Sequence, residues 1–191
     1  LGTSANKRFL EFHQRTGRKR TMEVEPCTYI VANAGYRVTE VIGRKRTGAD
    51  GFDFIVANGG MEVNTRPLLY GSRHPFSVVA ADGRLLSNEF NLAGLDPEAD
   101  RRIVVGRCCE SGDSQSLDDA GHIVERLMAA PALGDYVVVG GCGAYCSAMS
   151  PFNYNSHLQA PEVLLRADGS LTVVRRTQAV EQIWANEIGI L

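Results

Sequence analysis

The chain has 191 residues, and its 20 basic and 22 acidic side chains give a formal net charge of −2, which provides no general attraction to nucleic acid or anionic membranes. Hydrophobic residues make up 44% of the chain, enough for a sizeable core. No apolar run approaches the roughly 18 residues that a membrane span needs. From this and from the net charge, we expect neither a membrane nor a nucleic acid as a partner.

Residues 1–26 and residues 27–191 have different patterns. Residues 4–16 have the pattern of a short amphipathic helix, with Ser4 as N-cap and Gly17 at its end. Residues 21–25 alternate as in a strand, which Pro26 closes. We expect residues 1–26 to be the last helix and strand of a preceding α/β domain, and an initial Leu in place of Met supports a fragment.

From residue 27 onward, β-rich segments follow one another at short spacing. This spacing predicts a mainly β fold, a Greek-key-like barrel or sandwich, for residues 27–191. We expect a short helix over residues 179–187, with Trp184 on its apolar side. The expected strands are residues 28–41, 51–58, 77–81, 103–105, 136–139, 163–166 and 171–175, and Asp168-Gly169 turns the last two into a hairpin.

The five cysteines bear on the compartment and on metals. Their number is odd and two are adjacent, which argues against a secreted disulfide framework and favours the cytoplasm. Cys142 and Cys146 are four positions apart, but the sequence offers no second pair to complete four zinc ligands, so no metal site is predicted.

Gly106–Asp113 carries chemistry at the end of an expected strand. Cys109 offers a thiol that can donate a proton, and Glu110 a carboxylate that can hold an amine. The alternative is a buried small cysteine beside a solvated glutamate.

Two further motifs offer ligand-binding groups. Arg66 is a fixed fork for a carboxylate, and Tyr70 follows four positions later. Gly143 and Ala144 allow close approach to a flat ring or a phosphate, and Tyr145 adds a phenol. Alternatively, these are surface and packing residues in loops.

Four motifs occur in a fixed order: Glu25-Pro26, Arg66-Pro67-x-x-Tyr70-Gly71, Cys109-Glu110-Ser111-x-Asp113, and Gly143-Ala144-Tyr145 followed by Asn153-Tyr154-Asn155. With this set the chain resembles, over nearly its whole length, the C-terminal part of the pyridoxal-phosphate-dependent amino-acid decarboxylases of the alanine racemase-like fold. Within that family it looks most similar to the diaminopimelate decarboxylases.

The resemblance implies a two-domain homodimeric enzyme that converts meso-diaminopimelate to L-lysine and CO2. A (β/α)8 barrel would hold pyridoxal 5'-phosphate through a lysine, and a C-terminal β-barrel would complete the site across the dimer interface. By the same resemblance, Cys109 would be the catalytic proton donor. The substrate would be bound by Arg66, Tyr70, Glu110 and Tyr145, and the cofactor by Glu25, Pro26, Cys27, Thr28 and Tyr145.

The cofactor's lysine is expected outside this chain. The three lysines are Lys7, Lys19 and Lys45, and none follows an apolar strand in a sheltered position. We therefore expect the chain alone to be inactive.

Cys27-Thr28 departs from the Gly-Arg that usually follows Glu-Pro in this family. The change removes one carboxylate clamp. It leaves open a decarboxylase of ornithine or lysine, including their D forms, as well as a non-catalytic relative. An unrelated β-barrel binding module is a further alternative.

Overall fold

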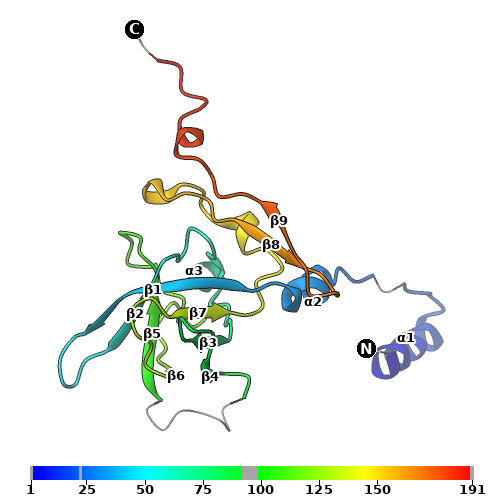
Figure 1. Ribbon diagram of the computed structural model, residues 1–191. Helices are drawn as coiled ribbons and strands as arrows, with labels where there is room; N and C mark the ends of the chain where they lie inside the picture. The colour runs from blue at the N-terminus through cyan, green and yellow to red at the C-terminus, as the bar shows by residue number, and fades with distance from the viewer. Residues whose placement is uncertain (1, 22, 92–98, 190–191) are drawn as a thin grey trace.

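A curled sheet of seven strands forms the body of the protein in a computed structural model that describes residues 2–21, 23–91 and 99–189 (Figure 1). The strand order is β4-β3-β7-β1-β2-β5-β6. Neighbouring strands are antiparallel except for the parallel pair β2 and β5. The bounds are β1 Arg37–Arg46, β2 Asp53–Ala57, β3 Phe76–Val79, β4 Leu85–Asn88, β5 Asp100–Val105, β6 Arg126–Met128 and β7 Tyr136–Val139.

The two edges of this sheet approach each other, so the sheet is a nearly closed barrel. Ala129, just after β6, donates its N–H to Ser87 Oγ in β4 at 3.0 Å. Arg126 in β6 forms an ion pair with Glu89, which directly follows β4. The inward side chains alternate with outward ones, as expected for half-buried strands. They form the core: Val41, Ile55, Ala57, Phe76, Val78, Val104, Met128, Val137 and Val139.

A separate hairpin follows the barrel in the sequence. It consists of β8 (Glu162–Leu165) and β9 (Leu171–Arg175), and it confirms the predicted Asp168-Gly169 turn, in which Gly169 has a φ of +82°. The hairpin lies outside the barrel (Figure 1). Its apolar side chains are exposed, among them Leu165, Leu171 and Val173.

Short helices complete the fold. They are α1 Gly2–Thr16, α2 Cys27–Val31 and α3 Arg66–Tyr70, with 3-10 turns η1 Ala32–Ala34, η3 Ser147–Met149, η4 Tyr154–Ser156 and η5 Val180–Ile183. The helix α1 lies apart from the barrel (Figure 1). It confirms the helix predicted for residues 4–16 but starts before Ser4, so Ser4 is not its cap. Among the described residues, no helix has the length and apolar character of a membrane span.

The mainly β, barrel-like prediction is confirmed, whereas three local predictions are wrong. Residues 21 and 23–25 form no strand, because an extended segment without a neighbouring strand has no hydrogen-bond partners. Residues 28–34 lie in α2 and η1 instead of a strand, because Pro26 begins a helical turn that overrides the β preference of Thr28 and Ile30. Residues 179–187 contain only the turn η5, because so short a segment is a marginal helix without packing.

Strands β4 and β6 were not predicted. Each is short, and each is defined by its neighbour in the sheet more than by its own composition.

Candidate active site

The buried carboxylate of Asp113 shapes the loop of residues 106–113. Its two oxygens accept backbone N–H groups from Met61 at 2.7 Å and from Cys108 at 2.8 Å. A Cβ atom at Gly60 or Gly106 would overlap this carboxylate. These glycines therefore let two chain segments close around Asp113, which fixes where the loop leaves β5.

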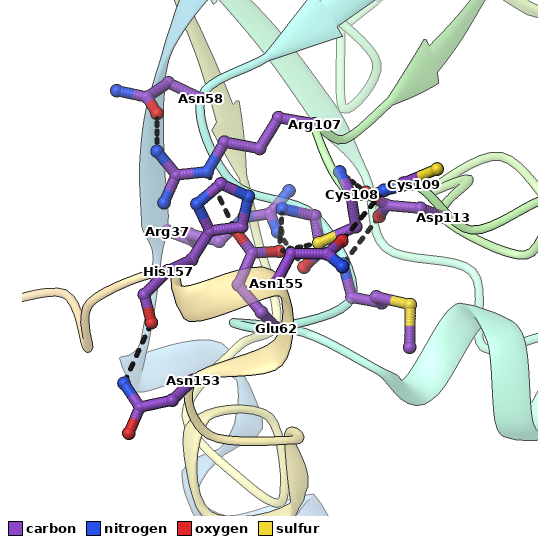
Figure 2. A network of polar contacts seen from close by, with 12 residues as sticks. Arg37, Asn58, Glu62, Arg107, Cys108, Cys109, Asp113, Asn153, Asn155 and His157 are labelled. Atoms are coloured by element: carbon purple, nitrogen blue, oxygen red, sulfur yellow. Dashed lines mark hydrogen bonds and ion pairs between the residues drawn. The ribbon is translucent and has the colours of Figure 1, made fainter. Parts of the chain in front are cut away.

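A second buried carboxylate, Glu62, binds the start of the same loop (Figure 2). It accepts the N–H of Gly60 at 2.8 Å, Nε of Arg107 at 3.1 Å and the thiol of Cys108 at 3.4 Å. Burial would raise the pKa of the Glu62 carboxyl, but these partners outweigh it and hold that pKa below its usual range. Arg107 also donates to Asn58.

The adjacent cysteines Cys108 and Cys109 have different surroundings. Burial first, then the charges of Glu62 and Asp113, raise the pKa of the Cys108 thiol to about 12, so Cys108 stays protonated near neutral pH. Cys109 is exposed, and its N–H donates to Asn155 Oδ1 at 2.9 Å. Figure 2 shows the two side chains leaving the loop beside Asp113.

Glu110 is exposed and joins the loop to η4. Its carboxylate accepts the N–H of Gly112 at 3.1 Å, the hydroxyl of Ser111 at 3.2 Å and the hydroxyl of Tyr154 at 3.4 Å. The Gly112 bond, followed by the Ser111 bond, lowers the pKa of Glu110. Two segments far apart in sequence, residues 106–113 and 153–155, therefore meet at Cys109 and Glu110.

Tyr145 and Cys27 meet at a second place. The Tyr145 hydroxyl lies 2.9 Å from Cys27 Sγ at the start of α2. This hydrogen bond lowers the pKa of Cys27 and raises that of Tyr145. Gly143 donates its N–H to the Ala32 carbonyl at 2.9 Å, and a Cβ there would overlap the carbonyl oxygen of Val31. Only glycine allows this close approach of the loop to α2.

Helix α3 brings Arg66 and Tyr70 to Tyr145. The Arg66 guanidinium lies 5.2 Å from the centroid of the Tyr70 ring and 5.9 Å from that of Tyr145. A depression of about 260 Å³ beside α3 is lined by Thr28, Arg66 and Arg73, among others. It offers cationic and hydroxyl groups to an anionic ligand.

The predicted site residues thus fall into two groups. Thr28 and Arg66 line the depression, and Tyr70, Tyr145 and Cys27 join them through the contacts of Arg66 with both rings and of Tyr145 with Cys27. Cys109 and Glu110 lie on the loop of residues 106–113. The two groups are in contact through Leu68 of α3. Its side chain packs so closely on the loop of residues 106–113 that a Cβ atom at Gly112 would overlap it. Glu25 and Pro26 precede α2 and are exposed.

Sequence reasoning missed Glu62. It lies two residues after Gly59-Gly60, a glycine pair that in the sequence indicates only the end of a strand. Glu62 follows β2, whereas Arg107 and Cys108 follow β5. Because β2 and β5 are parallel neighbours, these residues can be grouped into one site only once that strand pairing is known.

Comparison with known proteins places this geometry in a family. The family model described as "Pyridoxal-dependent decarboxylase, C-terminal sheet domain" matches residues 28–143. The chain therefore belongs to the pyridoxal-dependent decarboxylases and carries their C-terminal sheet domain.

Similar proteins in that family include diaminopimelate decarboxylases. The enzyme of Escherichia coli K12 is 35% identical over 167 residues, which cover 87% of this chain and 37% of the relative. That of Streptomyces coelicolor is 34% identical over 168 residues, or 87% of this chain and 35% of the relative. The chain thus spans well under half the length of these relatives.

Solved structures of diaminopimelate decarboxylases contain a region with a similar fold. A crystal structure of diaminopimelate decarboxylase has a TM-score of 0.77 at 33% identity, covering 95% of this chain and 40% of that one. The Helicobacter pylori enzyme complexed with L-lysine has a TM-score of 0.64 at 28% identity, covering 84% of this chain and 33% of that one.

Proposed function

We propose that this chain supplies the C-terminal half of the active site of a pyridoxal-phosphate-dependent decarboxylase that acts on a diamino acid, with meso-diaminopimelate as substrate and L-lysine and CO2 as products. The observation that carries the proposal is the chain of contacts from Tyr70 through Arg66 and Tyr145 to Cys27, in a chain of this family. Residues 1–26 would belong to the preceding barrel domain, which would provide the cofactor's lysine.

The residues around α2 fit the phosphate of the cofactor. Tyr145 can donate its hydroxyl to a phosphate oxygen. Among the described residues, no side chain caps the N-terminus of α2, so the backbone N–H groups of Cys27 and Thr28 are available as further donors. Glu25 and Pro26 would set the entry of this turn. When bound, the cofactor would supply an electron sink for the charge left as CO2 departs.

Cys109 would deliver the proton that replaces CO2 on the substrate carbon. The side chain is exposed, and the bond from its own N–H to Asn155 fixes its position. Cys108 is a poor candidate for this role, because its thiol is bound to Glu62.

Substrate recognition would use charges of both signs. Arg66 would bind the distal carboxylate and Tyr70 would line its path, whereas Glu110 would hold the distal amine. Depression of the pKa of Glu110 keeps it anionic for that role. We propose that Cys109 and Glu110 act in the site of the second subunit of a homodimer, in the cytoplasm.

A decarboxylase of ornithine or lysine is the second candidate, because Thr28 lines the depression where an arginine would otherwise assist Arg66. CO2 release should be measured from meso-diaminopimelate and from the D and L forms of lysine and ornithine, with protein that includes the N-terminal barrel. Turnover fastest with meso-diaminopimelate is the expected result. Preference for a monocarboxylic diamino acid would favour the second candidate, and cofactor binding without CO2 release from any of them would indicate a non-catalytic relative.

A further inference from the structure

We propose that His74, Cys142 and Cys146 form a binding site for one zinc ion. In the sequence the two cysteines lack further ligands, but the fold brings the His74 ring, 68 residues from Cys142, beside them. A ring nitrogen and the two sulfurs all lie within 4.8 Å of one another. Two sulfurs on a tetrahedral zinc ion are separated by roughly 3.8 Å, so only a small closure is needed.

The environment of His74 supports a ligand role. The residue is 5% exposed, and its Nδ1 lies 2.9 Å from the carbonyl oxygen of Gly140, to which it can donate. In that tautomer Nε2 carries the lone pair, and Nε2 is buried without a hydrogen-bond partner. Imidazoles that bind zinc commonly donate from the other nitrogen to a backbone carbonyl, as His74 Nδ1 can to Gly140.

Arg37 gives an independent indication. Its Nε and Nη2 are buried without an acceptor, and together with His74 Nε2 they make up the unpartnered buried side-chain nitrogens and oxygens of the described residues. The charge of Arg37 acts on both Cys142 and Cys146. Thiolates bound to a metal would place negative charge near this buried guanidinium, and Nε2 of His74 would gain the partner that it lacks.

Binding of zinc would release two protons from the protein. Zinc takes the imidazole lone pair and two thiolates, the two thiol protons pass to solvent, and a water fills the fourth position. Two thiolates neutralise the ion's charge, which makes a site next to Arg37 electrostatically acceptable.

The position of the site gives it a role in the proposed function. Tyr145 lies between the two cysteines and has a φ of +57°, a left-handed conformation that costs energy for tyrosine. Zinc bound by Cys142 and Cys146 would brace both sides of this residue and hold its phenol toward Cys27. This consequence rests on the proposed function, whereas zinc binding does not.

The test is zinc content, measured on purified protein after equilibration with Zn²⁺ and removal of free metal. About one zinc per chain is expected, with two thiols protected from a thiol reagent until a chelator is added. In Cys142→Ser, Cys146→Ser and His74→Gln, zinc affinity should fall at least about tenfold. The matched control is Cys108→Ser, which should keep its zinc, because Cys108 belongs to a different cluster with Glu62 and His157.

Absence of zinc in the wild-type protein would overturn the proposal, as would zinc loss confined to Cys108→Ser. Thiol protection in the wild-type protein needs no variant, so misfolding of a substituted chain would not leave the proposal untested. Because neither readout uses CO2 release, failure of this proposal and failure of the proposed function are distinguishable.

Discussion

At the residue scale, Glu62 determines how firmly the loop of residues 106–113 is held. We predict that Glu62→Gln lowers the free energy of unfolding at neutral pH by roughly 3 kcal/mol, because it leaves the buried side of Arg107 without its counter-charge. Urea unfolding would measure the change. Glu40→Gln, at an exposed position of β1, is the control and should have little effect.

The pH dependence of this effect follows from the lowered pKa of Glu62. A carboxyl whose pKa is depressed in the folded state stabilises the protein above its unfolded pKa of about 4.3, and this contribution is lost as the pH falls through the folded value. The difference between wild type and Glu62→Gln should therefore shrink on acidification. A difference that is constant or grows toward low pH would contradict the role assigned to Glu62.

Cys27 is a second titrating residue with a defined partner. Its pKa is lowered chiefly by the hydrogen bond with Tyr145, so its alkylation rate should rise at lower pH than that of an ordinary exposed thiol. We predict that Tyr145→Phe moves this midpoint upward. Mass spectrometry of the Cys27 peptide across a pH series measures it. An unchanged midpoint in Tyr145→Phe would mean that the 2.9 Å contact does not persist in solution.

At the scale of elements, the contact between α2 and the loop of residues 141–145 depends on Gly143. We predict that Gly143→Ala weakens binding of pyridoxal phosphate by about tenfold or more, because the added Cβ would push Tyr145 away from α2. Titration of the cofactor into protein that includes the barrel measures this. Gly189→Ala, where a Cβ meets nothing within 4 Å, is the control. Equal affinities of the two variants would contradict the predicted cofactor site.

The elements also show what the sequence could predict. Strand β7 and the β8–β9 hairpin were predictable, because apolar runs and the Asp168-Gly169 turn are local features. The start of α2 was not, because Pro26 overrode a β-branched composition. Cys109 and Glu110 could be identified as site residues to test, whereas Glu62 and His74 could not, because their partners lie 45 and 68 residues away.

At the scale of the whole molecule, the described chain presents apolar surface that its own barrel leaves uncovered. Tyr29 in α2 is 90% exposed, and Leu165 and Leu171 of the hairpin are 66% and 70% exposed. Exposed apolar patches of this kind indicate contact with other protein surface. They fit the proposal that a barrel domain and a second subunit pack here.

The central claim is that Cys109 on this domain donates the proton that completes decarboxylation. The most direct measurement is the rate of CO2 release from meso-diaminopimelate by protein that includes the barrel, comparing Cys109→Ala with Cys108→Ser, which keeps a donor for Glu62. We predict that kcat falls by about 10²–10⁴ in Cys109→Ala while cofactor binding is unchanged, and that Cys108→Ser stays near wild type. Wild-type kcat in Cys109→Ala would contradict the account.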